Sequence, residues 1–133
     1  MKSKKFTPGF TVIEIIIVVA ILGFASILFF TQKSSVESAA RDETRKTAIN
    51  SIYHNLESVY YEKNKSYPRT ISETTLPSIN PDLLKDTNGT KIGEGDSQYR
   101  YEPTGCSEED ACSGYSLRAI LETEDDFTKK NKN

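Results

Sequence analysis

The sequence is poor in the residues that usually supply catalytic or metal-binding groups. Its 133 residues include no tryptophan, one histidine (His54) and two cysteines (Cys106 and Cys112). A single histidine on a polar helix is usually solvent-exposed, so we assign no metal to His54, and we expect none elsewhere. The chain also has no phosphate-binding glycine motif and no nucleophile–base pair. We therefore expect no enzymatic activity and no cofactor.

The two cysteines do not form a Cys-x-x-Cys motif, because five residues separate Cys106 from Cys112. The spacing therefore supports neither a redox pair nor half of a zinc site. An even number of cysteines in an exported chain favours a disulfide. A reduced pair in a cytosolic protein is the alternative.

Positive charge is not in excess, since the formal net charge is −2. The first nine residues hold three lysines, and without them 14 Lys and Arg would stand against 19 Asp and Glu, a charge of −5. An acidic body lacks the electrostatic footprint of a nucleic-acid-binding protein. No specific nucleic acid is evident as a partner, although a local basic patch remains compatible with this charge.

Charge is absent altogether between Glu14 and Lys33. The nearly solid apolar segment Phe10–Thr31 has 22 residues, and as a helix it is about 33 Å long. This exceeds both a hydrocarbon core of about 30 Å and the apolar stretch of about 7–15 residues in an ordinary signal peptide. Three lysines precede the segment, and only Lys33 closely follows it. We predict a transmembrane helix with its N-terminus in the cytoplasm.

Helix-breaking residues are absent from Phe24 to Ser66. The spacing of apolar residues predicts that an amphipathic helix continues without interruption to about Lys65, where the approach to Pro68 ends it. The expected apolar face comprises Val36, Ala40, Ala48, Ile49, Ile52, Leu56, Val59 and Tyr60. Charged residues at positions 41–46 form a belt, in which Asp42 and Lys46 have favourable i,i+4 order.

The rest of the chain predicts a small sheet. Alternating residues indicate strands at Ser97–Pro103 and Tyr115–Glu122. The segment Thr104–Gly114 reads as the loop of their hairpin, with the cysteines near its ends. Asn80-Pro81 signals a single helical turn, and Asp125–Asn133 is expected to be a frayed polar tail.

The segment Asp86–Gly95 is rich in turn-forming residues and is predicted to be a loop. Asp86 and Glu94 give it some likeness to a calcium loop, but Lys91 stands where an EF-hand has glycine, so a plain turn is favoured. Asn88-Gly89-Thr90 fits the N-glycosylation pattern, although Asn-Gly is a strong turn signal by itself.

The most specific motif is Lys4-Lys5-Phe6-Thr7-Pro8-Gly9-Phe10-Thr11-Val12-Ile13-Glu14, which heads the apolar run. A carboxylate inside a membrane costs about 2.5–3.5 kcal/mol, so it marks a function and needs a partner. The motif resembles the class III signal peptide of the type IV pilin and type II secretion pseudopilin superfamily. The segments Val59–Pro68, Tyr99–Tyr101 and Gly114–Ala119 also resemble the helix end and strands of this superfamily.

The resemblance implies an α+β, type IV pilin-like fold with a long N-terminal helix on a small antiparallel sheet. Its parts would be a leader (1–9), a transmembrane and assembly helix (10–31), an amphipathic helix (32–66), and an αβ-loop with a sheet head (67–133). Two departures are the absence of a proline near Thr31 and a sheet with two recognisable strands, where three or four are usual.

The resemblance also implies site residues. A prepilin peptidase would cut between Gly9 and Phe10 and N-methylate the Phe10 amine. Glu14 would then accept the Phe10 ammonium of a neighbouring subunit or of its own chain and so guide subunit assembly. A membrane anchor with an incidental glutamate is the alternative.

The expected function is that of a structural subunit of a type IV pilus, for adhesion, twitching motility or DNA uptake. Two alternatives remain: a pseudopilin of a type II secretion system, which would usually show a calcium-dependent C-terminal loop, and a monomeric membrane-anchored binding domain. The implied partners are copies of the chain itself, prepilin peptidase, the pilus assembly platform, minor pilins and, before assembly, the membrane. The chain would reside in the inner or cytoplasmic membrane and then in an extracellular filament.

Overall fold

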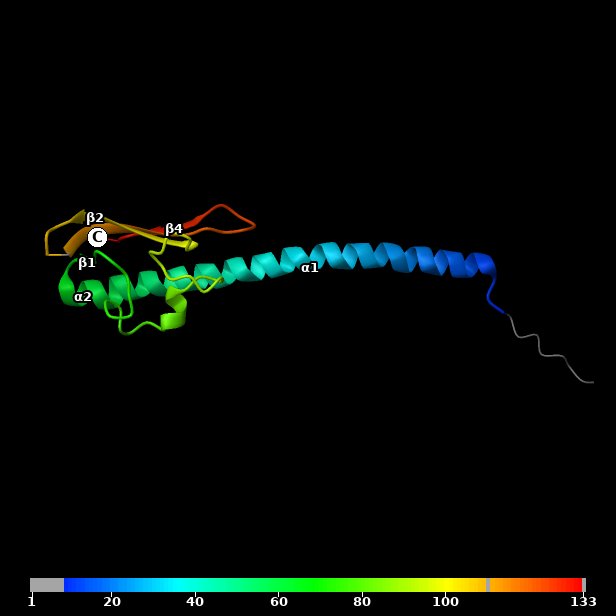
Figure 1. Cartoon of the computed structure of the whole chain (residues 1–133), viewed down its shortest axis with the longest axis horizontal. Helices are drawn as coiled ribbons and strands as arrows, with labels where there is room; N and C mark the ends of the chain where they lie inside the picture. Colours follow the sequence, from blue (N-terminus) through cyan, green and yellow to red (C-terminus); the bar gives the residue numbers. More distant parts are fainter. Residues whose placement is uncertain (1–8, 110, 133) are drawn as a thin grey trace, which may run out of the picture. The chain divides into compact units, whose positions relative to one another are not determined.

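The computed structural model describes residues 9–109 and 111–132 of the chain (Figure 1). Of the predicted leader, residues 1–8 lie outside the described residues. The chain divides into two compact units after Val36. The second unit holds a helix packed on a small antiparallel sheet, an α+β arrangement consistent with the predicted pilin-like fold.

A long helix dominates the secondary structure. It comprises α1 (Val12–Asn55), a π-helical turn η1 (Leu56–Tyr60) and α2 (Tyr61–Asn64) in direct succession. The predicted continuous helix is thus confirmed, apart from the π-helical turn, which the sequence did not indicate. A π-helical turn accommodates one more residue per turn than the α-helix around it.

The helix ends near Lys65 as predicted, but for a different reason. Lys65 itself adopts the left-handed conformation, with φ of 53°, and its N–H bonds to the carbonyl oxygen of Tyr61 at 2.8 Å. Such a residue is a common helix terminator. Pro68 lies farther on, in the short strand β1 (Tyr67–Pro68).

One face of the helix is buried within the second unit. The predicted apolar face is correct from Ala48 onward, whereas Val36 and Ala40 are exposed. The buried face also contains two charged residues, Asp42 and Arg45, in line with Ile49. The core that it forms with the loops and the sheet comprises Ala48, Ile49, Ile52, Leu56, Tyr67, Ile71, Leu76, Ile79, Leu84, Ile92, Tyr99, Cys112, Tyr115, Leu117, Ala119 and Leu121.

The sheet is antiparallel and centred on β3 (Ala111–Ala119). The strand β2 (Tyr99–Cys106) pairs along one edge of β3, so β1 and β4 (Phe127–Lys130) must share the other edge. The described part of the chain therefore contains four strands where the sequence indicated two.

Two further predictions about the sheet region need correction. The predicted loop Thr104–Gly114 is mostly strand, because the β2–β3 pairing continues to the Cys106–Cys112 pair. The tail predicted to be frayed contains β4. That strand is held by pairing with β3 and by Lys129, whose ammonium lies 5.5 Å from the centre of the Tyr53 ring.

The helical turn predicted after Asn80 is confirmed as the 3₁₀-helix η2 (Pro81–Leu84). The Asn80 side chain accepts a hydrogen bond from the backbone N–H of Asp82 at 3.0 Å. This is the capping role that the Asn-Pro sequence predicts.

Candidate membrane and assembly segment

The first helix turn is fixed by Thr11. Its hydroxyl oxygen accepts a hydrogen bond from the Glu14 backbone N–H at 3.3 Å, and its carbonyl oxygen accepts one from Ile15 at 3.2 Å. Threonine three residues before glutamate is the capping-box sequence. Glu14 therefore has a local role as the acidic residue of the first turn, where the helix dipole favours negative charge.

The helix that follows has no buried side chain in the first unit. Every described residue from Gly9 to Val36 is exposed. The large apolar side chains between Phe10 and Phe30 have exposed fractions from 47% at Val18 to 77% at Phe10. Apolar patches on soluble monomers rarely exceed a few hundred Å², so an exposed apolar surface of this extent is typical of a membrane-contacting or protein-binding segment.

By length and composition, this is a helix that could cross a membrane. Its hydroxyl groups are compatible with that environment. The Ser26 hydroxyl donates to the Leu22 carbonyl at 2.7 Å, and the Thr31 hydroxyl lies 3.0 Å from the Leu28 carbonyl. No hydroxyl hydrogen of these two residues would therefore be left without an acceptor in lipid.

Gly9, Phe10 and Glu14, the residues predicted to carry processing and assembly, are all exposed at the head of this segment. Across residues 9–109 and 111–132, the Glu14 carboxylate makes no ion pair. The expected pairing of Glu14 with a Phe10 ammonium, of a neighbouring subunit or of its own chain, could form only after cleavage has freed that amine. Cleavage, methylation and pairing stay predictions.

The predicted disulfide between Cys106 and Cys112 is present. These residues face each other at the end of the β2–β3 pair, with Cys112 buried and Cys106 half-buried. The bridge therefore fastens the turn end of the hairpin formed by β2 and β3. It stabilises the sheet, and it is remote in sequence from the apolar helix.

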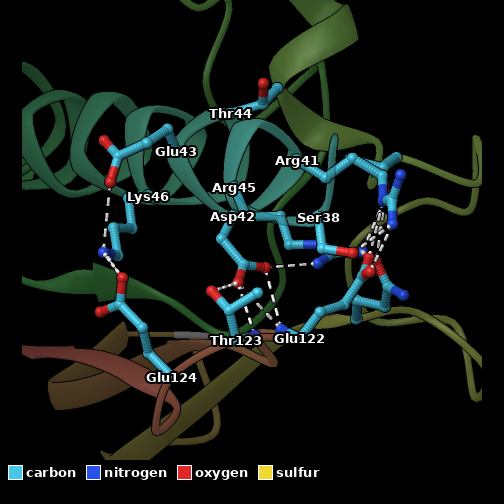
Figure 2. Close-up of polar contacts among 12 residues, drawn as sticks. Ser38, Arg41, Asp42, Glu43, Thr44, Arg45, Lys46, Glu122, Thr123 and Glu124 are labelled. Carbon is cyan, nitrogen blue, oxygen red and sulfur yellow. Dashed lines mark hydrogen bonds and ion pairs between the residues drawn. The ribbon is translucent and has the colours of Figure 1, made fainter. Parts of the chain in front are cut away.

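A buried ion network fastens the segment between β3 and β4 to the helix (Figure 2). Asp42, with 1% of its surface exposed, accepts hydrogen bonds from the backbone N–H groups of Glu122 and Thr123 at 2.9 and 2.8 Å. It also accepts one from the Thr123 hydroxyl at 2.7 Å and one from Arg45 at 2.7 Å. All of these partners therefore donate hydrogen bonds to the Asp42 carboxylate.

Arg45 lies at the centre of the network and is equally buried. Its guanidinium bonds to Asp42, to Glu122 at 2.6 Å, to Gln98 at 2.9 Å and to Thr87 at 3.0 Å. A buried guanidinium is tolerated only when its donors find partners. Here the partners come from the helix, from the segment before β2 and from the segment after β3.

The network changes the ionisation of both acids. Burial alone would raise the pKa of Asp42, but the hydrogen bonds from Thr123, Glu122 and Arg45 outweigh it and hold the pKa well below its usual value. Hydrogen bonds from Arg41 and Arg45 lower the pKa of Glu122 to about 2. Both groups are therefore charged at neutral pH.

The charged belt predicted at positions 41–46 gives no indication that Asp42 and Arg45 are buried, as they are in the structure. The available signal was their spacing, since positions 42, 45, 49 and 52 continue one helix face. The expected i,i+4 pairing of Asp42 with Lys46 is not what forms: Lys46 bonds to Glu43 at 3.3 Å and to Glu124 at 2.8 Å.

The lesser candidate residues have ordinary structural roles. His54 is exposed, and its Nδ1 lies 3.4 Å from the Ser58 hydroxyl. The Asp86 carboxylate accepts hydrogen bonds from the backbone N–H groups of Asn88, Thr90 and Gln98, as in a plain turn. Within the described ranges, no three His, Cys, Asp or Glu side chains are grouped to hold a metal ion.

Comparisons of the chain with known protein families, with curated proteins and with solved structures found no match. The functional interpretation therefore depends on the motif at the N-terminus and on the geometry described above.

Proposed function

We propose that this chain is a structural subunit of a type IV pilus-like filament, made as a membrane-anchored precursor and processed between Gly9 and Phe10. The observation that carries the proposal is the wholly exposed apolar helix of the first unit, headed by Gly9-Phe10 and Glu14, in a chain whose second unit packs a helix on a small sheet. Such a helix can be covered first by lipid and then by the same helices of neighbouring subunits.

The physical basis of assembly is twofold. Contact between apolar side chains supplies the association, at about 25 cal/mol for each Å² of apolar surface that is removed from water. Charge supplies the register: cleavage would create an ammonium on Phe10, and leaving it or Glu14 unpaired in a dry filament core costs several kcal/mol. Subunits would therefore stack where the Phe10 ammonium of one chain meets the Glu14 carboxylate of another.

The secretion pseudopilin is the nearest rival to this proposal. The disulfide near the C-terminus is a feature shared with many pilins, and it favours the pilus. Electron microscopy of material sheared from cells, with mass spectrometry for this chain, tests the choice. Abundant surface filaments that contain the chain support a pilus subunit, whereas its absence from such filaments contradicts the proposal.

A pair of variants tests the role of Glu14. Glu14→Gln keeps the capping-box pattern but removes the charge, whereas Thr11→Ala removes the helix cap, worth about 1 kcal/mol, and keeps the charge. We expect Glu14→Gln to insert into the membrane normally and to yield no filaments, and we expect Thr11→Ala to assemble. A normal filament yield from Glu14→Gln would refute the charge-pairing mechanism.

Processing has a separate readout. The intact mass of the filament subunit should correspond to a chain that begins at Phe10, with one added methyl group. Filament subunits that retain Met1–Gly9 would contradict the proposed maturation.

A further inference from the structure

The loop between η2 and β2 presents an asparagine that the proposed function does not use. A bridge between Lys85 and Lys91 closes the loop. Inside it, the Asp86 carboxylate accepts hydrogen bonds from the backbone N–H groups of Asn88 and Thr90, both at 2.9 Å. The loop backbone is therefore fixed from within, and the Asn88 side chain is left at the tip.

The Asn88 side chain is exposed, and it makes no hydrogen bond to any described residue. The next residue, Gly89, has φ of 84°, and there is open space around the position of a Cβ. Its N–H donates to the Asp86 carbonyl at 2.9 Å, so the nitrogen that would attack Asn88 during spontaneous deamidation is engaged in the turn. The carboxamide of Asn88 is thus accessible to an enzyme.

The sequence contains two Asn-x-Ser/Thr sites, and the structure distinguishes them. Asn64-Lys65-Ser66 lies at the end of α2, where the Asn64 side-chain nitrogen donates to the Tyr60 carbonyl at 2.9 Å. The Ser66 hydroxyl is also engaged, 3.3 Å from the Asn64 carbonyl. In Asn88-Gly89-Thr90, neither the asparagine carboxamide nor the threonine hydroxyl makes such a hydrogen bond to a described residue.

We propose that Asn88 is a site of N-linked glycosylation, and that Asn64 is not. The donor would be an oligosaccharide linked through pyrophosphate to a membrane lipid. In the transfer, the Asn88 side-chain nitrogen forms a bond to C1 of the first sugar, the bond from C1 to the pyrophosphate oxygen breaks, and the nitrogen gives one proton to a carboxylate base of the transferase. The lipid pyrophosphate leaves with the bonding electrons.

The chemistry explains why the free side chain matters. Resonance with the carbonyl makes a carboxamide nitrogen a poor nucleophile, so the transferase must bind the carboxamide group and twist its C–N bond. A nitrogen already held by a helix carbonyl, as in Asn64, is not available for this. The inference rests on the proposed function in one respect, since the head must be exported to the side of the membrane where lipid-linked sugars are transferred.

The test uses the full chain purified from the envelope of the cells that produce it. Trypsin cuts after Lys85 and Lys91 and releases Asp86–Lys91, which contains the whole site. We expect tandem mass spectrometry to find this peptide with the added mass of a glycan on Asn88, and we expect a second protease to yield Asn64 unmodified.

Matched variants separate glycosylation from other modifications. Thr90→Val should abolish the added mass, because valine matches threonine in shape but lacks the hydroxyl that the motif requires. Thr90→Ser should retain it, and Asn64→Gln should leave it unchanged. A glycan that persists in Thr90→Val, or one attached to Asn64, would overturn the proposal.

Two failures can be told apart by probing intact cells with protease. A processed, surface-exposed chain with bare or deamidated Asn88 would overturn the glycosylation and leave the proposed function standing. A head that stays protected in the cytoplasm would overturn both.

Discussion

Replacement of Asp42 tests whether the buried ion network holds the head of the molecule together. In Asp42→Ala, the N–H groups of Glu122 and Thr123 and one donor of Arg45 lose their acceptor. Removing one partner of a buried ion pair typically costs about 3–5 kcal/mol. Domains of this size have total stabilities of about 5–15 kcal/mol, so a large share of the stability would be lost.

The measurement is urea unfolding of the full chain in detergent, monitored through the circular dichroism signal of the tyrosine-rich core. Glu43→Ala is the matched control on the same helix, because the Glu43 side chain is 72% exposed and, among the residues that the structure describes, pairs only with Lys46. Its loss should change the unfolding free energy by less than about 0.5 kcal/mol.

A double-mutant cycle sharpens the test. Arg45→Met removes the guanidinium and keeps an apolar stem, and in Asp42→Ala/Arg45→Met neither buried charge remains. We expect the loss of unfolding free energy in the double variant to be smaller than the sum of the losses in the two single variants, by about 0.5–3 kcal/mol. If Asp42→Ala costs no more than Glu43→Ala, the network is not what fastens the sheet to the helix.

Three further predictions concern the same head. Folding lowers the pKa values of Asp42 and Glu122, so their contribution to stability is complete above about pH 5 and declines as the pH falls, with that of Glu122 lost by about pH 2. The urea midpoint should therefore drop between pH 5 and pH 3, and an unchanged midpoint would contradict this. Reduction of Cys106–Cys112 should lower the unfolding free energy by about 2–3 kcal/mol, and an unchanged melting temperature would argue against it. Lys65→Gly should raise the unfolding free energy by up to about 1 kcal/mol, because glycine adopts positive φ without strain, and a loss of stability would refute this account of the helix end.

The helix could be predicted from the sequence because its signals are local. These signals involve residues that are close together in sequence: the apolar run, the spacing of Ile49, Ile52 and Leu56, and the absence of proline. The π-helical turn at Leu56–Tyr60 was not predicted, because none of these local signals marks an extra residue in the helix.

The sheet was predicted only where alternation was strong. Tyr115, Leu117 and Ala119 alternate with exposed or half-buried residues and were correctly assigned to one face. The short strand β1 and the polar strand β4 lack that pattern and exist because β3 offers them a free edge. Pairing of this kind depends on contacts far apart in sequence.

The candidate assembly residues were found from a motif, whereas the buried ion network was not. Asp42 and Arg45 are polar, and polar residues are usually exposed, so composition alone places them on the surface. Their burial depends on Glu122 and Thr123, about 80 residues away, which bring matching charge and backbone N–H groups. The disulfide was predictable because the even cysteine count and the hairpin agreed.

The π-helical turn carries a consequence for sequence comparison. It is equivalent to one inserted residue, and one residue advances an α-helix by about 100°. A homologue with a regular helix here would need one residue fewer between Leu56 and Tyr60 to keep Tyr61 stacked on Tyr67. An alignment should therefore place a single-residue gap at this point, where a gap inside a helix would ordinarily be rejected.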